Sequence, residues 1–216
     1  MANPGSTERT KLNRISYKAS NSTQDLYSIL DDNLVAHVAV IHDSKPLVIP
    51  MAYGRVGNTL YLHGSSGSRL MRLLADDPEV CVSITQLTAL KVARSTFNSG
   101  MHYRSVVIFG QARLVSDAEK DQALNALSDA MIPGRVAEVR SSTKKELAAT
   151  LIVAVELDET SVKISVNEVD DEESDLNQGV WAGIVPINSN WGKPIPADEE
   201  AESLEVPQSI RRLTGF

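Results

Sequence analysis

Residues 34–64 read LVAHVAVIHDSKPLVIPMAYGRVGNTLYLHG and contain three strand-like runs, of which the first two are rich in β-branched residues. Two inserts separate the runs. The first, Asp43-Ser44-Lys45, is turn-like, and the second, Gly57-Asn58, is typical of a two-residue hairpin turn. Three consecutive strands joined by such short turns predict an antiparallel sheet, because parallel neighbours need a long crossover connection.

The sequence on either side of this core continues the pattern of short strands and helices. A short helix is expected before it, capped by Ser22 or Thr23, and another after Ser68, which Pro78 stops. Ser116 and Glu119 frame a capping box at the start of a third helix, which ends at Pro133-Gly134. A short helix and a strand are expected within residues 146–159. Strands are also predicted over residues 80–87, 91–97, 103–117 and 160–168.

About eight strands with a few short helices indicate a mainly β fold, a small antiparallel barrel. A parallel α/β fold would need a helix after nearly every strand, and the first three strands have none. We expect a flexible N-terminal arm over residues 1–20, the barrel domain over 21–187 and an extended C-terminal tail over 188–216. The acidic residues 169–178 predict a solvated linker, and the apolar residues 180–187 should dock on the domain.

Composition excludes several classes of protein. With 42% hydrophobic and 23% charged residues the chain is globular, and its net charge of -7 argues against a nucleic-acid partner. The single cysteine, Cys81, excludes an internal disulfide, and its apolar setting predicts a buried, inert thiol. The polar N-terminus carries no secretory signal and no stretch is apolar enough to cross a membrane, so the expected location is cytoplasmic.

Residues 63–69, HGSSGSR, are the most informative stretch for chemistry. They join a strand to a helix, and two readings stay open. Glycine backbone N–H groups, serine hydroxyls and Arg69 could cradle a phosphate, or the stretch could be an ordinary turn with an N-cap. A phosphate cradle without an evident nucleophile would fit chemistry borrowed from a cofactor.

The four histidines do not show the spacing of a metal site, so no metal ligand is predicted. His37 alternates with apolar neighbours and is expected to be a hydrogen-bonded core residue. No G-x-S-x-G elbow is present, and the catalytic residues stay unknown.

Taken together, LYLHGS-x-x-SR and YRSVVIFG resemble the flavin-nucleotide-binding branch of the pyridoxamine 5'-phosphate oxidase-like superfamily. The pieces IPGRVAEVR, KKELAATLIVAVEL and VWAGIVPI resemble it in order and spacing, so the likeness runs from about residue 14 to 187. It implies an FMN-binding split barrel and a homodimer with FMN at the subunit interface. By position, it also implies cofactor-binding roles for Pro50, Met51, Ala52, Tyr53, His63, Gly64, Ser65, Ser68, Arg69, Tyr103, Arg104, Ser105 and Trp181.

One departure from the true oxidases affects the predicted activity. Their Arg-x-Val-Leu-Leu-Lys strand is matched here by KPLVIPM, so proline or methionine replaces the lysine and Arg69 carries more of the phosphate charge. We therefore do not predict pyridoxamine-phosphate oxidase activity. The expected function is an FMN-dependent oxidoreductase that uses NADH or NADPH on a small molecule. A flavin-binding or sensing module without turnover, a split barrel holding haem or a deazaflavin, and a purely structural dimerisation domain remain alternatives.

Overall fold

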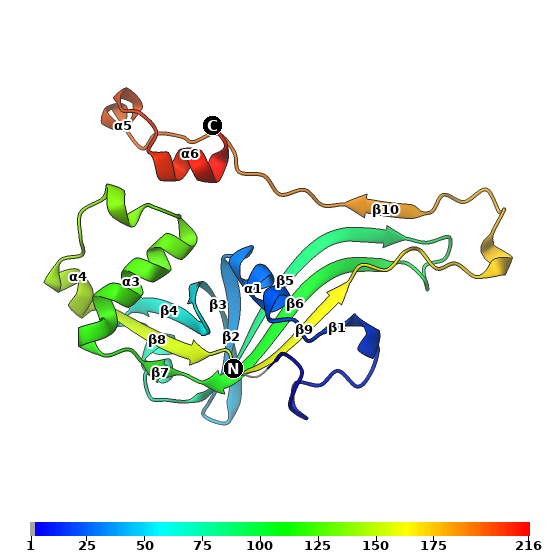
Figure 1. Cartoon of the computed structure of the whole chain (residues 1–216), viewed down its shortest axis with the longest axis horizontal. Helices are drawn as coiled ribbons and strands as arrows, with labels where there is room; N and C mark the ends of the chain where they lie inside the picture. Colours follow the sequence, from blue (N-terminus) through cyan, green and yellow to red (C-terminus); the bar gives the residue numbers. More distant parts are fainter. Residues whose placement is uncertain (1–2) are drawn as a thin grey trace. The chain divides into compact units, whose positions relative to one another are not determined.

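The computed structural model describes residues 3–216, which fold mainly into antiparallel strands with six short α-helices (Figure 1). The chain divides into two compact units, and the division falls within strands β5 (Glu79–Val92) and β6 (Gly100–Gln111). The first unit comprises the described residues up to Asn33, Ser83–Ile108 and Asp158–Ser189. The second comprises Leu34–Val82, Phe109–Leu157 and Asn190–Phe216.

The second unit is built on an antiparallel sheet with the strand order β2-β3-β4-β8-β7. His42 pairs with Lys45, so the first turn contains only Asp43 and Ser44, whose φ angles are 49° and 59°. The hairpin predicted from the turn residues is confirmed. The strands are β2 (Val35–His42), β3 (Lys45–Val56), β4 (Thr59–Ser65), β7 (Arg113–Leu114) and β8 (Thr150–Glu156).

Helix α3 (Asp117–Met131) packs on this sheet, chiefly on β3. Gly54 permits the close approach, because a Cβ there would lie 3.0 Å from both Leu127 Cα and Ala130 Cβ. Leu127 is completely buried in this contact. The remaining helical segments of the unit are α2 (Arg69–Leu74), η2 (Val136–Glu138), α4 (Lys144–Ala149), α5 (Glu199–Ser203) and α6 (Gln208–Thr214).

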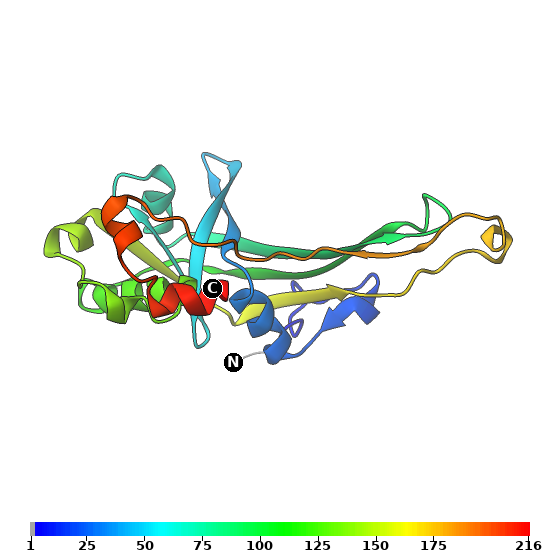
Figure 2. The same cartoon turned by 90° about the horizontal axis from the view of Figure 1, so that it is seen from above.

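The first unit contains the strand order β1-β9-β6-β5, with β10 paired to β5. The long strands β5, β6 and β9 run side by side in both views (Figures 1 and 2). The apolar piece expected to dock does so through β10, whose Val185 pairs with Leu90. The elements are η1 (Ser16–Lys18), β1 (Ala19–Ser20), α1 (Thr23–Asp31), β9 (Glu159–Ser165), η3 (Glu173–Asp175) and β10 (Gly183–Pro186).

Helix α1 is capped as the sequence predicts, since the Ser22 side chain accepts from the Asp25 N–H. The separate strand predicted over residues 91–97 is wrong. β5 runs unbroken to Val92, and the chain then turns because the Ser99 hydroxyl accepts from the Ala93 N–H and donates to the Ser95 carbonyl. Such local side-chain bonds compete with a strand ladder.

Two further expectations differ from the structure. Ser116 precedes α3, but its hydroxyl donates to the Glu119 carboxylate at 2.8 Å instead of capping a backbone N–H, so the predicted capping box is not formed. The acidic linker is not simply solvated, because the Asp171 carboxylate accepts from the Arg94 backbone and guanidinium and its side chain is 4% exposed. The segment 188–216, expected to be extended, contains α5 and α6.

Candidate functional site

Strand alternation sorts the predicted residues of β3 and β4 onto two faces of the sheet. Gly54 and Tyr61 pair and lie on the face that α3 covers, because Tyr61 packs with Ala123 of that helix. Ala52 and His63, two residues away along their strands, therefore share this face, and Pro50 follows them. By the same alternation, Met51, Tyr53 and Gly64 belong to the opposite face, where a Cβ on Gly64 would meet Met71 of α2 at 2.8 Å.

Beyond the part that α3 covers, the same face is exposed and apolar. Val35 pairs with Ala52, and His37 pairs with Pro50. Val35 is 50% exposed, Val48 56% and Ile41 66%. His37 is exposed here, so its prediction as a core residue is wrong: Ala36 and Val38 are the neighbours that point inward. Alternation in the sequence does not reveal which of two apolar faces is buried.

In the predicted phosphate cradle, the backbone N–H groups of residues 66–68 already donate to acceptors of the protein itself. The Ser66 N–H donates to the Ala149 carbonyl, the Gly67 N–H to the Ser65 hydroxyl and the Ser68 N–H to the Ser65 carbonyl. The Ser68 hydroxyl caps α2 by accepting from the Met71 N–H at 3.5 Å. Anion binding at this turn would therefore depend on side chains, among them the exposed guanidinium of Arg69.

A cavity of about 340 Å³ lies beside His63. Leu127, Met131, Ile132, Val136 and Val139 give it an apolar lining, and its polar side chains come from β4, from α3 and from the residues on either side of η2. The volume falls within the ordinary range for small-molecule sites. The lining residues are His63, Asn125, Leu127, Ser128, Met131, Ile132, Arg135, Val136, Val139, Arg140, Ser141 and Ser142.

The His63 imidazole brings to this cavity a buried nitrogen without a protein partner. Its Nδ1 is buried and makes no hydrogen bond with any described residue. Burial lowers the pKa of the imidazole from its usual value, so the ring is neutral near pH 7. A neutral imidazole with an unengaged nitrogen can accept a hydrogen bond from a ligand or coordinate a metal.

Two arginines bring positive charge to the cavity, and each is paired with a nearby carboxylate. Arg135 lies 3.3 Å from Glu138, and Arg140 reaches both oxygens of Glu146 at 2.9 and 2.6 Å. The guanidinium of Arg140 and the donors of Thr143 lower the pKa of Glu146 to about 2. Neither arginine was predicted from the sequence as a site residue, although the stretch IPGRVAEVR that carries them contributed to the family likeness.

The remaining predicted residues lie in the first unit. Arg104 uses its guanidinium there: it donates to Asp32 at 2.8 Å, to Ser28 at 3.3 Å and to Gln86. The ring of Tyr103 lies under the Lys163 ammonium at 5.6 Å. Ser105 is half-buried. Trp181 is 64% exposed and rests against Gly183, where a Cβ would lie 2.9 Å from its ring.

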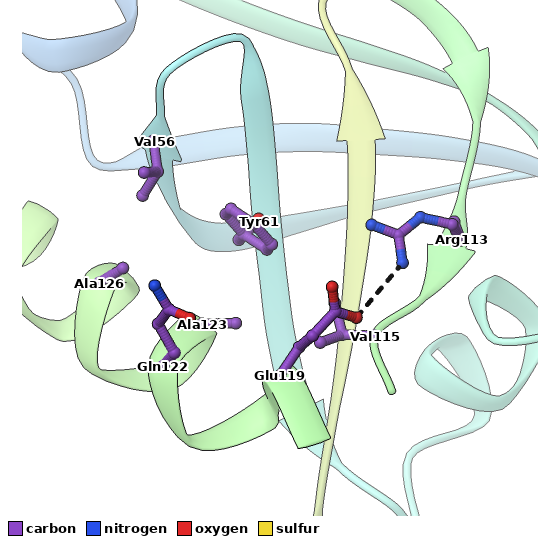
Figure 3. Close-up of a pocket in the computed structure, with 8 residues that line it drawn as sticks. All are labelled: Val56, Tyr61, Arg113, Val115, Glu119, Gln122, Ala123 and Ala126. Carbon is purple, nitrogen blue, oxygen red and sulfur yellow. Dashed lines mark ion pairs between the residues drawn. The ribbon is translucent and has the colours of Figure 1, made fainter. Parts of the chain in front are cut away.

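A second cavity under α3 is too small for a cofactor ring. Tyr61 packs with Ala123 here, and Figure 3 shows the ion pair between Arg113 and Glu119 beside them. The Arg113 nitrogen and the Glu119 oxygen lie 3.8 Å apart. Its volume is about 130 Å³, well below the range of small-molecule sites. This leaves the His63 cavity as the better candidate on the α3 face.

No group of three His, Cys, Asp or Glu side chains in residues 3–216 gathers as a protein-only metal site would require. Within the same range, no helix combines the length and apolar character needed to cross a membrane.

Comparison with known proteins agrees with the geometry of the fold. The family model described as pyridoxamine 5'-phosphate oxidase matches residues 22–164, about two thirds of the chain. The chain belongs to this family. The resemblance inferred from LYLHGS-x-x-SR and YRSVVIFG is therefore confirmed, as is the mainly β split-barrel fold. Among curated proteins, no match is found.

Two solved structures match nearly the whole length of this chain. The FAD and haem binding protein from Mycobacterium smegmatis is 42% identical, with a TM-score of 0.89, over 91% of this chain and 97% of that one. The flavocytochrome Anf3 from Azotobacter vinelandii is 30% identical, also with a TM-score of 0.89, over 99% of each chain. Both likenesses extend beyond the residues that the family model matches.

Proposed function

We propose that this protein is a redox protein that binds a flavin and a haem. The observation that carries the proposal is His63, a neutral imidazole with an unpartnered buried nitrogen at the edge of an apolar cavity. The chain containing it is 42% identical to a protein named for binding FAD and haem. When bound, the flavin would exchange one or two electrons and the haem iron one.

The flavin fits the exposed apolar face of β2 and β3. Pro50 and Ala52 offer a flat surface with no competing charge, which suits an isoalloxazine ring. Arg69 supplies a cation near the end of β4 for a phosphate. FMN is the flavin expected from the sequence, but we propose FAD, because the Mycobacterium smegmatis relative is named for FAD.

The side chains that line the His63 cavity suit a haem. Leu127, Met131 and Val136 supply an apolar wall for the porphyrin, and His63 supplies an imidazole for the iron. Arg135 and Arg140 would bind the two propionates, because guanidinium groups pair with carboxylates. These side chains would hold the ring, exclude water from one side and neutralise its anionic edge.

The visible spectrum of the purified protein tests both cofactors. We expect flavin bands and a Soret band, restored by added FAD and haemin where the protein emerges colourless. Extraction and mass determination of the flavin will distinguish FAD from FMN. A protein that shows neither set of bands after reconstitution would overturn the proposal.

The residue assignment is tested by one pair of histidine variants. His63→Ala should remove or shift the Soret band and leave the flavin bands in place. His37→Ala is the matched control, because His37 lies on the same sheet face but does not line the cavity. An unchanged Soret band in His63→Ala would contradict the assignment.

The proposed source of electrons is a reduced nicotinamide. Anaerobic mixing with NADH or NADPH should bleach the flavin bands, and the faster of the two identifies the donor. Tight flavin binding without reduction by either would favour the alternative reading, a flavin-binding or sensing module.

We also propose that the protein is a homodimer. The exposed face of β2 and β3 that carries Val35, Ile41 and Val48 is a contiguous apolar surface of the kind that marks an interface. Burial against a second copy would enclose a flavin that one sheet face leaves open.

A further inference from the structure

The C-terminal helix α6 is fastened to one wall of the His63 cavity by a single carboxylate. Ser209 is 2% exposed, and its backbone N–H donates to Glu138 Oε1 at 2.9 Å while its hydroxyl donates to Oε2 at 2.5 Å. Glu138 is the last residue of η2, and Arg135 and Val136, which line the cavity, lie at its beginning. A segment about 70 positions away in sequence therefore supports the cavity wall.

Glu138 connects α6 to the cavity cation. The same Oε2 that accepts from Ser209 lies 3.3 Å from the Arg135 guanidinium. The donors of Ser209, with Arg135, hold the pKa of Glu138 below its usual value, so this carboxylate is ionised. The other side of η2 is tied to α3, because the Val136 N–H donates to Asp129 at 2.9 Å. The wall is thus fixed at both ends, once to α3 and once to α6.

The N-cap position of α6 explains why this contact is specific. Pro207 precedes the helix and offers no side-chain cap, so the first-turn N–H of Ser209 would lack a side-chain acceptor from its own helix. Glu138 supplies one from outside, and an anion at a helix N-terminus is also favoured by the helix dipole. The Glu138 carboxylate is therefore stabilised by the Ser209 N–H, by the Ser209 hydroxyl, by Arg135 and by the helix dipole. Removal of either Ser209 hydrogen bond weakens the attachment of α6.

We propose that α6 is part of the haem site: Ser209, acting through Glu138, positions Arg135 and the η2 wall and thereby slows the loss of haem. Ser209 is a positioning residue in this arrangement, since the cavity itself is lined by other side chains. The inference rests on the proposed binding of haem in the His63 cavity. It adds α6 to the proposed haem site, although this helix lies outside residues 22–164, the range that the family model matches.

The rate of haem loss tests the proposal. The full-length protein is loaded with haemin and mixed with excess apomyoglobin, and transfer is followed by the Soret absorbance. Ser209→Ala removes one hydrogen bond to a charged acceptor, so we expect about tenfold faster loss. Ser209→Thr keeps the hydroxyl and should retain the wild-type rate. The matched control is Ser203→Ala in α5, whose hydroxyl donates only to the Glu200 carbonyl nearby.

Hydrogen exchange on the haem-free protein gives a readout that does not depend on the cofactor. Amides of residues 134–139 should exchange faster in Ser209→Ala and in Glu138→Gln than in wild type, with no change in Ser203→Ala. Equal haemin loss and equal exchange in Ser209→Ala and wild type would overturn the role of α6 alone. A wild-type protein that takes up no haemin would instead overturn the proposed function, and this inference with it.

Discussion

At the scale of single residues, Glu146 has the most strongly perturbed carboxyl group. Arg140 donates to both of its oxygens, and the Thr143 N–H donates to Oε2 at 2.7 Å. These donors stabilise the charged form and lower its pKa from 4.5 to about 2. Because the folded pKa is the lower one, the stabilisation is present above pH 4.5 and is lost as the pH falls toward 2.

A carboxyl titration by NMR tests this. Glu146 should titrate near pH 2 in wild type and move back toward 4.5 in Arg140→Gln, because Arg140 is the largest cause of the shift. Arg113→Gln serves as the control, since Arg113 pairs with Glu119 and not with Glu146. A Glu146 pKa that is the same in Arg140→Gln and wild type would show that the ion pair does not form in solution.

Only some residues of the candidate site could be predicted from the sequence. His63 is identified from its place between a strand and a small polar loop, and the structure places it at a cavity. Arg135 and Arg140 lie about 70 residues later, on segments with little regular structure, so no periodicity in the sequence brings them to His63. Only the packing of α3 against β3 and β4 does so. Likewise, the turn after β4 has the composition of a phosphate cradle, but its N–H groups find partners within the loop and at Ala149.

At the scale of elements, the packing of α3 on β3 depends on Gly54. A Cβ at this position would lie 3.0 Å from Leu127 Cα and from Ala130 Cβ, so the helix would have to move by a few tenths of an ångström. Overpacking of this kind costs about 1–3 kcal/mol, offset in part by ~0.5–1 kcal/mol from removing a flexible glycine in a strand. Gly54→Ala should therefore lower the free energy of unfolding by about 1 kcal/mol, and Gly54→Val by more.

Chemical denaturation measures this loss. Gly192→Ala is the matched control, because a Cβ there has no atom within 4 Å and its φ is not positive. Since Leu127 and Met131 of α3 also line the His63 cavity, haemin affinity should fall in Gly54→Val and stay unchanged in Gly192→Ala. A Gly54→Val protein as stable as wild type would mean that α3 does not approach β3 as closely as described.

Elements were predicted well where one local rule acts alone. The β2–β3 turn follows from Asp43 and Ser44, and the α1 cap from Ser22. The capping-box prediction fails where the two side chains hydrogen-bond to each other. Ser116 and Glu119 have the spacing of a capping box, but the Ser116 hydroxyl donates to the Glu119 carboxylate. The box forms instead at Thr143 and Glu146, where Arg140 holds the carboxylate in place.

At the scale of the whole molecule, the family likeness reaches further than the motifs that reveal it. The family model ends at residue 164, whereas the Azotobacter vinelandii flavocytochrome matches 99% of the chain. Residues 169–216 were expected to be a linker, one docked piece and an extended tail. They contain the buried carboxylate of Asp171, the paired strand β10 and the anchored Ser209, all of which depend on partners distant in sequence. Composition alone, which is acidic and rich in proline, could not predict these contacts.

The proposed dimer leads to a prediction for the assembled protein. Val48 is 56% exposed near the centre of the apolar face, beside Ala39 of β2. A lysine there would put an unpaired charge into the interface, which we expect to cost about 3 kcal/mol and to raise the dimer Kd by about a hundredfold. The isolated subunit should be affected by less than about 0.5 kcal/mol, because the side chain is at the surface. Val48→Lys should therefore sediment as a folded monomer at micromolar concentration and retain less flavin. Val56→Lys, on the same strand at the turn to β4 and 44% exposed, should remain dimeric. A dimer that persists in Val48→Lys would place the interface on another surface and remove the argument that this face is closed by a second copy.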